Sequence, residues 1–380
     1  MNSSKNLPAG RQVWDELNKG VFVIAELGKN FIQTEEEKSV VEYLENAKKL
    51  VKAAYEAGAS AVKFQTHNAE DEQLNIKIVA PHFKGERYAW VTRNQSATPI
   101  NEFWKPLKAY CDKLGIIFFS TPMSRGAAQI LDKVGVDLWK IGSSDILDFP
   151  MLDYMRLSGK PIIISSGMST VDELDRAIAF IKEKNDKVAL LHCVSKYPCP
   201  PDELNFGTIN FLKERYGLPT GFSDHSIGVE AALGAVALGA KIIEKHFSFS
   251  RDLWGSDHKV SMTPDELKKL TDGINAITAS ENVRKEYLSK DIVKLALGNG
   301  TKSLSDDEAK FRPVMRKGLM AGKDIPAGTV VTADMIYAMR PYQYAIDLGA
   351  LPSENYELVL GKKAKKDIKK YEPIAESNLS

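Results

Sequence analysis

The sequence predicts an α/β fold, a (β/α)₈ barrel of the TIM type, followed by a small β-rich domain. Short β-branched runs alternate with longer amphipathic stretches between residues 21 and 269. Each run is apolar on both faces until its carboxyl end, as expected for strands buried in a parallel sheet. Eight such units within roughly 250 residues fit a closed barrel. After residue 277 the amino-acid composition becomes charged and then rich in Gly and Pro turns, which indicates a second domain.

Segments with helical periodicity separate the eight expected strands. The clearest are 41–57, 99–114, 170–184 and 228–238, and Thr170 with Glu173 forms a capping-box pattern. A doubly wound open sheet is the competing architecture, but no G-x-G-x-x-G follows the first strand. The expected strands are VFVIAE at 21–26, SAVKFQ at 60–65, IIFFST at 116–121, LWKIGS at 138–143, PIIISS at 161–166, VALLHC at 188–193, PTGFSD at 219–224 and AKIIEKH at 240–246.

The connection from residue 67 to about 98 is unusually long and polar, and it carries His82, Phe83, Tyr88 and Trp90. Loops of this length inside a compact domain are mostly functional covers or disordered segments. Because this one follows the second strand, we expect it to lie over the catalytic end of the barrel.

The chain divides into a barrel domain over 1–280, a charged linker with some helix over 281–310, and a β-rich domain over 311–380. The last part repeats K-D-I at 323–325 and 366–368. A unit of about 65 residues buries little core of its own. We therefore expect it to pack on something larger.

Composition excludes several classes of protein. Lys plus Arg total 51 and Asp plus Glu total 50, for a net charge of +1, so there is no general attraction to nucleic acid or membrane. The first twenty residues lack the apolar core of a signal peptide, and the longest weakly polar run, 231–240, is too short to span a bilayer. Cys111, Cys193 and Cys199 make no disulfide framework, which favours a cytoplasmic location.

Polar side chains gather where the expected strands end. A buried strand half needs no Lys or His, so this concentration indicates a site rather than packing. The carboxyl ends of the strands carry the active site of a barrel. The residues are Glu26, Lys63, Gln65, Ser120, Thr121, Lys140, Ser143, Ser144, Asp145, Ser165, Ser166, His192, Ser195, Tyr197, Ser223, Asp224, His225, Glu244, Lys245 and His246.

Two histidines, His225 and His246, come from neighbouring strand ends. Neutral imidazoles so placed, together with water and substrate oxygens, suit Mn²⁺ or Mg²⁺ better than a closed zinc site. The alternative, in which each histidine only bonds a loop backbone, is equally compatible with the spacing.

Lys63 and Lys140, with the hydroxyl groups of Thr121, Ser143 and Ser223, make a cradle for phosphate and carboxylate. Lysine supplies a point charge, whereas hydroxyl and backbone N–H groups supply directed bonds. Ion pairs with Glu26 or Glu244 are the alternative interpretation of these lysines.

Eight segments occur in a fixed order: IAELG at 24–28, GASAVKFQT at 58–66, FFSTP at 118–122, WKIGSSD at 139–145, ISSGMST at 164–170, HCVSKYPCP at 192–200, GFSDHSIG at 221–228 and EKHFSFSRDLWGSDHK at 244–259. As an ordered set they resemble the sialic acid synthase family, which includes N-acetylneuraminate, legionaminate and pseudaminate synthases. The tail VMRKGLMAGKDIPAGTVVT resembles the antifreeze-like (SAF) domain of that family.

This resemblance implies an enzyme that condenses phosphoenolpyruvate with an N-acetylated amino sugar and water, at Mn²⁺ or Mg²⁺, to give a nonulosonic acid and phosphate. The sugar would be N-acetylmannosamine or a diacetamido-trideoxyhexose. The resemblance implies that phosphoenolpyruvate binds Lys63, Thr121, Lys140, Ser143 and Ser223, that the metal binds His225 and His246, and that the sugar contacts Gln65, Tyr197 and Asp257.

A basic residue from the small domain of a partner, Arg316 or else Lys317, is implied to complete the site. Thirty linker residues span roughly 50 Å even when half extended, on the reach of about 3.3 Å per residue. We therefore expect a domain-swapped homodimer. A small domain docked on its own barrel is the alternative.

Several positions depart from the family pattern. Members read N-H-N-G or N-H-E-G after the first strand, whereas this chain has N-F-I-Q at 30–33 and lacks the acidic residue. Asp145 stands where members usually have Glu, and Ser195 stands where some have Asn. These changes touch the amino-sugar side more than the phosphoenolpyruvate side.

Asp145 is the expected catalytic group that orients the sugar or moves a proton. Glu26 is a second candidate, although an ion pair with Lys63 or Lys245 explains it equally well. Rival functions are a 3-deoxy-sugar acid synthase or similar condensation, a Schiff-base aldolase using Lys63 or Lys140, and a non-catalytic sugar-binding scaffold of polysaccharide assembly. The small C-terminal domain disfavours the first rival, and the paired His and Lys residues disfavour the last.

Overall fold

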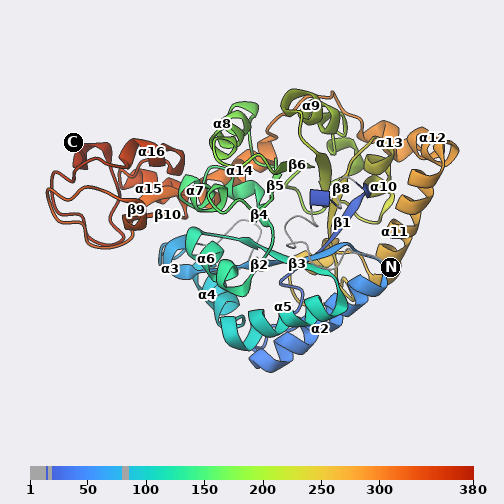
Figure 1. The fold of residues 1–380 in the computed structure, drawn as a ribbon, viewed down its shortest axis with the longest axis horizontal. Helices are drawn as coiled ribbons and strands as arrows, with labels where there is room; N and C mark the ends of the chain where they lie inside the picture. The colour runs from blue at the N-terminus through green and yellow to red at the C-terminus, as the bar shows by residue number, and fades with distance from the viewer. Residues whose placement is uncertain (1–13, 16–18, 79–84) are drawn as a thin grey trace.

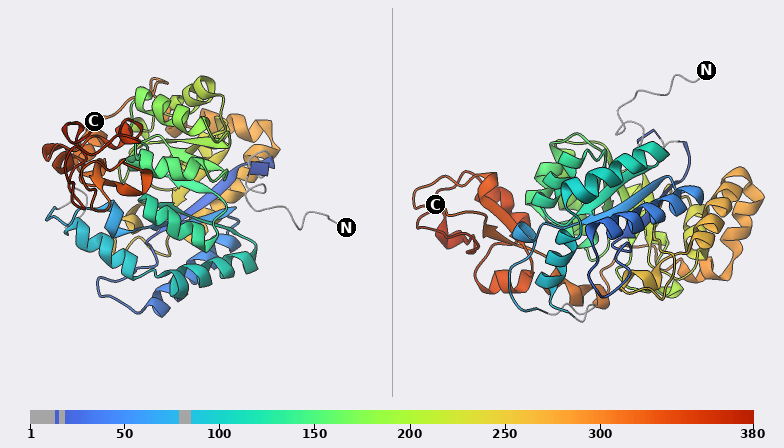
Figure 2. Two further views of the ribbon diagram at one scale, coloured as in Figure 1. Left: turned by 60° about the vertical axis from the view of Figure 1, so that its left-hand side comes forward. Right: turned by 90° about the horizontal axis from the view of Figure 1, so that it is seen from below.

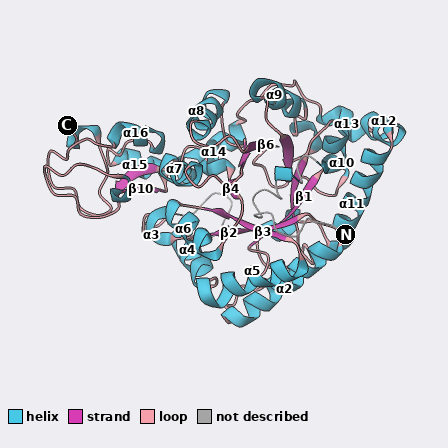
Figure 3. Cartoon of the chain, viewed as in Figure 1, coloured by secondary structure: helices cyan, strands magenta, loops and turns pink. Residues whose placement is uncertain are grey.

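The computed structural model describes residues 14–15, 19–78 and 85–380. Eight parallel strands form a barrel surrounded by helices (Figures 1 and 3). The hydrogen-bonded order is β3-β2-β1-β8-β7-β6-β5-β4, and β3 also lies beside β4, so the barrel is nearly closed. The strands are β1 (Phe22–Gly28), β2 (Ala61–Thr66), β3 (Ile117–Pro122), β4 (Trp139–Ile141), β5 (Ile162–Ser165), β6 (Val188–Cys193), β7 (Thr220–Asp224) and β8 (Ile242–His246).

All eight predicted strands are confirmed, with small shifts at their ends. The barrel interior is filled by inward-facing apolar side chains such as Phe22, Ile24, Phe119 and Ile163. Outward-facing side chains of the same strands pack against the helices in a second, larger core. Strands buried on both faces explain why the sequence shows continuous apolar runs rather than alternation.

The four predicted helical segments are confirmed, and the one at 99–114 divides into a π-helical turn and an α-helix. The capping box of Thr170 and Glu173 is present. None of the described helices is long and apolar enough to cross a membrane. The helices around the barrel are α2 (Val40–Glu56), α3 (Ala69–Glu72), α4 (Arg87–Ser96), η1 (Ile100–Trp104), α5 (Lys105–Leu114), α6 (Arg125–Val134), η2 (Ser143–Asp145), α7 (Phe149–Arg156), α8 (Val171–Lys182), η3 (Pro201–Glu203), α9 (Gly207–Tyr216), α10 (Glu230–Ala237), η4 (Asp257–Val260) and α11 (Pro264–Ala279).

The described parts of the long connection after β2, residues 67–78 and 85–98, contain α3 and α4, and α4 buries Arg87, Val91 and Asn94 on one face at helical spacing. Two polar residues on the buried face hide this helix from a hydrophobicity pattern. His82 and Phe83, which the sequence singled out, lie outside the described residues.

The segment predicted as a linker is largely helical and packed. It forms α12 (Glu281–Ser289) and α13 (Asp291–Ala296), which contact α10, and Val293 and Ala296 are buried. The charged residues that suggested a linker lie mostly on the exposed face. The predicted boundary at 310 falls inside α14 (Asp306–Met315), so this helix joins barrel and small domain without a break.

The small domain combines a two-stranded antiparallel sheet with turns and short helices. Its K-D-I repeats lie against each other, because Ile325 and Ile368 form an antiparallel bridge. Their buried side chains continue the core of the barrel. The elements are β9 (Gly318–Ala321), η5 (Ala333–Met335), β10 (Ile336–Met339), α15 (Tyr342–Asp347), η6 (Ser353–Asn355), α16 (Tyr356–Val359) and η7 (Glu376–Asn378).

Within one chain the small domain docks beside α7 and α3 of its own barrel (Figures 1 and 2). Arg340 is fully buried and bonds Glu72 and Asp145 of two barrel loops. Arg125 donates to the carbonyl oxygens of Ala333 and Ile336 at 2.6 and 2.7 Å. These contacts are those expected if the small domain docks on its own barrel, the alternative to a domain-swapped dimer.

Candidate active site

A pocket of about 530 Å³ opens at the carboxyl ends of the barrel strands. This volume lies in the range of about 300–1,000 Å³ that small-molecule sites occupy. The barrel brings side chains from all its strand ends toward this one opening, as the fold requires. Of the residues to which the sequence assigned a catalytic, substrate-binding or metal-binding role, all but Asp145 and Arg316 line it, whereas the strand-end residues Ser120, Ser166, His192, Asp224 and Lys245 do not. The predicted residues that line it are Glu26, Lys63, Gln65, Thr121, Lys140, Ser143, Ser195, Tyr197, Ser223, His225, His246 and Asp257.

Lys63 and Lys140 are the buried cations of the pocket. The Lys63 Nζ donates to Thr121 Oγ1 at 2.9 Å and lies 2.6 Å from Glu26 Oε2. The Lys140 Nζ donates to Ser165 Oγ at 2.6 Å. Two ammonium groups with neighbouring hydroxyls can hold a ligand that carries phosphate and carboxylate groups.

Glu244 lies between the two lysines. Its carboxyl oxygens are 3.8 Å from Lys63 Nζ and 3.9 Å from Lys140 Nζ, and Ser223 donates to Oε1 at 3.1 Å. Burial alone would raise the pKa of Glu244, but the charges of Lys140 and Lys63 lower it. The ion pairs that the sequence offered as an alternative are therefore present together with the cradle of hydroxyls.

Burial raises the pKa of Glu26 from 4.5 to about 7, with the Glu244 charge adding to the effect and Lys63 opposing it. Glu26 Oε1 accepts a hydrogen bond from Gln65 Nε2 at 3.1 Å. A carboxyl group with this pKa can both accept and donate a proton near neutral pH. When Glu26 is protonated, the positive charges of the lysines exceed the negative charge of Glu244, which favours an anionic ligand.

His225 and His246 face each other with ring centroids 5.7 Å apart. His225 Nδ1 donates to the Val194 carbonyl at 2.8 Å, which is the bond to a loop backbone that the alternative interpretation of this histidine predicts. This bond leaves the Nε2 lone pair free to bind a metal. His246 Nδ1 is buried and has no hydrogen-bond partner among the described residues. Burial lowers the pKa of His246 to about 4, which keeps its imidazole neutral. This donor set fits a divalent cation.

No group of three or more His, Cys, Asp or Glu side chains that could hold a metal occurs in the described part of the chain. A cation bound by the two histidines would therefore complete its coordination with water or substrate oxygens, as Mn²⁺ and Mg²⁺ do.

Tyr197, Gln65 and Asp257 also line the pocket. The Tyr197 ring centroid is 3.9 Å from that of His225, and 54% of the Tyr197 surface is exposed. Gly28 brings the backbone close to Gln65 and Asp257. A Cβ there would lie 3.4 Å from Gln65 Nε2 and 3.5 Å from Asp257 Oδ2, and its φ of +48° also favours glycine.

Ser143 and Ser195 approach each other over Gly167. A side chain at Gly167 would collide with both hydroxyl groups, so only glycine allows the two serines to face the pocket. The Ser143 Oγ also lies 3.5 Å from the buried Cys193 Sγ.

Helix α14 forms one wall of the pocket through Phe311 and Met315. Glu308 attaches this helix to the barrel, because its Oε1 accepts from the backbone N–H groups of Met168 at 2.8 Å and Ser195 at 3.0 Å. Its Oε2 completes a capping box at the start of the helix. The wall is thus fixed to loops that carry pocket residues.

The structure does not bring Asp145 to the pocket. Its Oδ1 lies 2.6 Å from Arg340 Nη2 and 2.9 Å from Lys317 Nζ. Burial alone would raise the pKa of Asp145, but these two cations hold it far below its usual range. The turn of η2 aims this carboxylate at the small domain, so Asp145 is an anchor for Arg340 rather than a group facing the sugar.

Arg316 also lies outside the pocket. Its Nη2 donates to the Met168 carbonyl at 2.6 Å, and its Nη1 lies 3.4 Å from the Ser143 carbonyl. It lines a smaller pocket of about 280 Å³ between α14 and the small domain. Within one chain Arg316 fixes two barrel loops, and Lys317 bonds Asp148 at 2.6 Å instead of a ligand.

Sequence reasoning missed His67, Arg87 and Trp254 as pocket residues, and it identified Trp90 only as part of the long connection. His67 had a signal, because it continues the two-residue spacing of Lys63 and Gln65 just beyond the end of β2. Arg87 and Trp254 had none, since Arg87 lies between β2 and β3 and Trp254 follows β8, outside the strands.

The departure from the family pattern at 30–33 builds an apolar wall. Asn30 donates to the Phe247 carbonyl at 2.9 Å and to Ser261 Oγ at 3.0 Å. Phe31 and Ile32 are buried, and Ile32 lines the pocket in the segment where the resemblance implied an acidic residue.

Comparison with known proteins is consistent with this geometry. Residues 50–285 match the NeuB family and residues 316–380 match the SAF domain. The chain is 32% identical over 370 residues to N,N'-diacetyllegionaminic acid synthase of Campylobacter jejuni, covering 94% of this chain and 100% of that protein. It is 32% identical over 366 residues to pseudaminic acid synthase of the same species, covering 95% and 97%.

Among solved structures, the spore coat polysaccharide biosynthesis protein SpsE of Bacillus subtilis has a TM-score of 0.73 at 31% identity, covering 95% of each chain. The family match spans more than half of this chain, and the relatives cover nearly all of it. The barrel, the pocket at its strand ends and the appended domain agree with that assignment. The chain therefore belongs to the NeuB family of sialic acid synthases, and it carries a C-terminal SAF domain.

Proposed function

We propose that this protein is an enzyme that condenses phosphoenolpyruvate with the open-chain form of an N-acetylated amino sugar and water, releasing phosphate and a nonulosonic acid. The observation that carries the proposal is the meeting of two buried lysines and two facing histidines in one pocket. The names of the relatives, which are synthases of diacetyllegionaminic and pseudaminic acid, support it.

The lysine side of the pocket suits phosphoenolpyruvate. Lys63 and Lys140 offer charge to its phosphate and carboxylate groups, and Thr121, Ser143 and Ser223 offer hydroxyl donors. Binding there displaces the ion pairs of Lys63 with Glu26 and Glu244. Protonation of Glu26 would lower the cost of that exchange, since it removes one of the two competing negative charges.

The histidine side suits the aldehyde. His225 and His246 would hold Mn²⁺ or Mg²⁺, and a cation held there supplies Lewis-acid polarisation of the aldehyde oxygen. Tyr197, Gln65, Ser195 and Asp257 then contact the rest of the sugar. N-acetylmannosamine and a diacetamido-trideoxyhexose are the two sugars that the proposal admits.

In the reaction, C3 of phosphoenolpyruvate forms a bond to the aldehyde carbon, and the aldehyde oxygen takes up a proton. Water adds to C2 and gives up a proton, which Glu26 can accept once its own proton has passed to the aldehyde oxygen. The tetrahedral C2 then expels phosphate and becomes the ketone of a 2-keto acid. Asp145 acts on this sequence only through Arg340 and the loop that carries Ser143.

The decisive experiment is a phosphate-release assay with phosphoenolpyruvate, Mn²⁺ and each of the two sugars. We expect release only when metal and sugar are both present. His225→Ala and His246→Ala should abolish release and Mn²⁺ binding while melting temperature changes little. Release without sugar, or near-normal release by either variant without metal, would contradict the proposal.

The Schiff-base rival has one supporting observation, since burial lowers the pKa of Lys140. Borohydride with pyruvate would trap a covalent adduct on such an enzyme, and we expect none.

The three cysteines are buried and free, which fits the proposed cytoplasmic location.

A further inference from the structure

His67 directly follows β2 and continues the two-residue spacing of Lys63 and Gln65 beyond the end of the strand. All three residues line the pocket. At about 3.3 Å per residue, His67 lies roughly 13 Å further along the strand than Lys63. If phosphoenolpyruvate occupies the Lys63 end, His67 is placed beside the far end of the second substrate.

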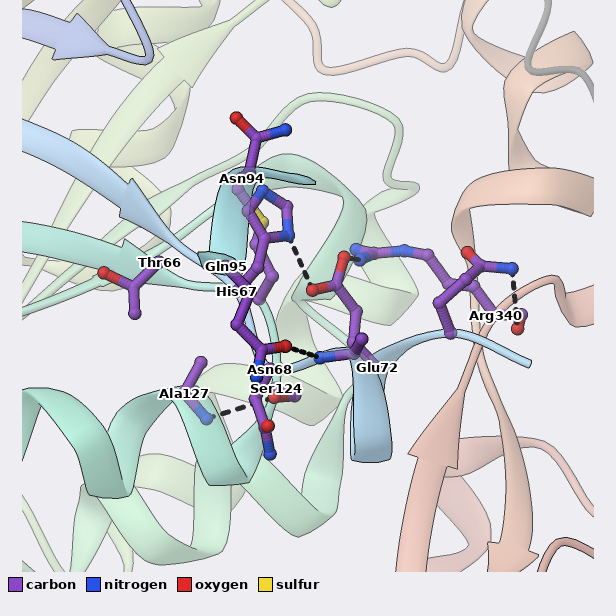
Figure 4. A network of polar contacts seen from close by, with 12 residues as sticks. Thr66, His67, Asn68, Glu72, Asn94, Gln95, Ser124, Ala127 and Arg340 are labelled. Atoms are coloured by element: carbon purple, nitrogen blue, oxygen red, sulfur yellow. Dashed lines mark hydrogen bonds and ion pairs between the residues drawn. The ribbon is translucent and has the colours of Figure 1, made fainter. Parts of the chain in front are cut away.

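One nitrogen of His67 has no partner. The side chain is almost fully buried, and Nδ1 lies 2.6 Å from Glu72 Oε2 (Figure 4). Nε2 is buried without a hydrogen-bond partner among the described residues. A buried polar atom left unpaired costs about 1–3 kcal/mol. An unpaired nitrogen that borders a pocket is therefore suited to a polar group on a ligand.

The surrounding charges indicate that His67 is neutral and that its proton is on Nδ1. Glu72 accepts from His67 and also bonds Arg340, which lies 3.2 Å away in the small domain. Burial lowers the pKa of His67 to about 4. The nearby positive charges of Lys29 and Arg87 oppose protonation of the imidazole, and Glu72 is already paired with Arg340. Since a carboxylate only accepts, Nδ1 donates and Nε2 keeps its lone pair.

We propose that His67 determines specificity for the sugar, with Nε2 accepting a hydrogen bond from a hydroxyl or amide N–H group at the end remote from the aldehyde carbon. This inference rests on the proposed function, because that function places an amino sugar in the pocket. Trp90 and Trp254 line the same pocket with ring centroids 5.8 Å apart, and such rings suit the apolar faces of a sugar.

Glu72 and Arg340 are positioning residues for His67. Glu72 fixes the ring orientation and the tautomer, and Arg340 fixes Glu72 from the small domain (Figure 4). Docking of the small domain is thereby connected to the sugar end of the pocket through two hydrogen bonds.

The test combines enzyme variants with substrate variants. Each protein is assayed with the sugar that turns over and with an analogue lacking its remote donor. The analogue is the 6-deoxy form of N-acetylmannosamine, or the N-methylated 4-acetamido form of the diacetamido sugar. The wild type should lose about tenfold in kcat/KM with the analogue, the effect of one buried hydrogen bond. With both sugars, His67→Phe should have the low kcat/KM that the wild type shows with the analogue. His67→Gln, which keeps an acceptor, should restore part of the difference in kcat/KM between the two sugars.

His192→Phe is the matched control, because His192 is also a buried barrel histidine with an unpaired ring nitrogen but does not line the pocket. It should preserve the wild-type preference between the two sugars. Equal loss for both sugars in His67→Phe, or a raised KM for phosphoenolpyruvate alone, would overturn the proposal.

A second measurement tests the role of His67 without turnover. In the ¹⁵N spectrum of histidine-labelled protein, assigned by the signals that His67→Phe removes, Nε2 of His67 should be unprotonated and should shift when N-acetylmannosamine is added. A protonated Nε2, or no shift on addition, counts against His67. If no sugar supports phosphate release, the proposed function fails, and the spectrum still decides the role of His67.

Discussion

Lys63 is surrounded by Thr121, Glu26 and Glu244, whose oxygens lie 2.9, 2.6 and 3.8 Å from its ammonium group. An ammonium group held by this many partners is already oriented for an anionic ligand. Lys63→Ala should therefore raise the KM for phosphoenolpyruvate far more than that for the sugar. Each charge-assisted bond lost should cost about 1.5–3 kcal/mol. Steady-state kinetics with each substrate varied in turn measures the split.

Lys245→Ala is the matched control for Lys63→Ala. Lys245 is equally buried at the end of β8, which β1 separates from β2, but it bonds Asp224 at 2.7 Å and lies outside the pocket. Its loss should lower the melting temperature and leave both KM values unchanged. If Lys63→Ala behaves in the same way, Lys63 does not bind phosphoenolpyruvate.

At the residue scale, the sequence predicted the pocket well because barrel geometry brings all strand ends to one opening. Within one chain the structure places Asp145 and Arg316 outside the pocket, for a physical reason. Asp145 lies in a turn after β4, and Arg316 lies in the small domain, so partners distant in sequence determine where each points. Arg340, which joins the small domain to Glu72 and Asp145 of the barrel, stands in no segment that the sequence singled out.

Helix α14 shows the same effect at the scale of elements. The strands were predictable as continuous apolar runs, and most helices were predictable because their burial follows the helical period. Helix α14 includes Pro313 and buries Glu308 rather than an apolar stripe, so its position depends on polar contacts of Glu308 and of Arg312, which bonds Glu173. The helix therefore lies in a segment divided between a predicted linker and a predicted domain.

Glu308→Ala should detach this pocket wall. Two backbone N–H groups, of Met168 and Ser195, would lose a charged acceptor, and bonds of this kind contribute about 1.5–3 kcal/mol each. We expect a lower melting temperature and a higher KM for the sugar, because Phe311 and Met315 lose their support. Glu308→Gln, which keeps one acceptor oxygen, should be intermediate. An unchanged sugar KM in both variants would show that α14 is not part of the site.

At the scale of the whole molecule, the docked small domain should respond to acid through Glu72. Burial alone would raise the pKa of Glu72, but His67, Arg340 and Arg87 lower it from 4.5 to about 2. A carboxyl group with a lowered pKa stabilises the folded state above its unfolded pKa and loses this effect as pH falls through the folded value. A shift of this size corresponds to about 3 kcal/mol.

Wild type and Glu72→Gln should therefore differ in unfolding free energy by a constant amount above pH 5, and the difference should shrink as pH falls toward 2. Denaturant unfolding at a series of pH values measures it. A difference that stays constant down to pH 2.5 would mean that Glu72 does not hold the small domain as a charged group.

The domain-swapped homodimer stays a prediction. The contacts of the small domain lie within one chain in this structure, and in a swapped dimer the same contacts would form between chains. Mixing Arg316→Ala with His225→Ala should then restore part of the activity after subunits exchange. In each mixed dimer, one of the two pockets would have both Arg316 and His225 intact. Confirmed exchange without recovery would mean either that the domain docks within a single chain or that Arg316 is the wrong residue, and repeating the experiment with Lys317→Ala decides between the two.

The docked small domain contacts the barrel at the place where β3 and β4 lie side by side. These are the two strands at the ends of the hydrogen-bonded order. Lys317 joins the loops that follow them, through the Met123 carbonyl at 2.5 Å and Asp148. The small domain thus holds β3 and β4 together, the two barrel strands that are not hydrogen-bonded to each other. During synthesis this contact would form only after the small domain has left the ribosome. In a chain ending at residue 315, amide exchange would be fastest along β3 and β4.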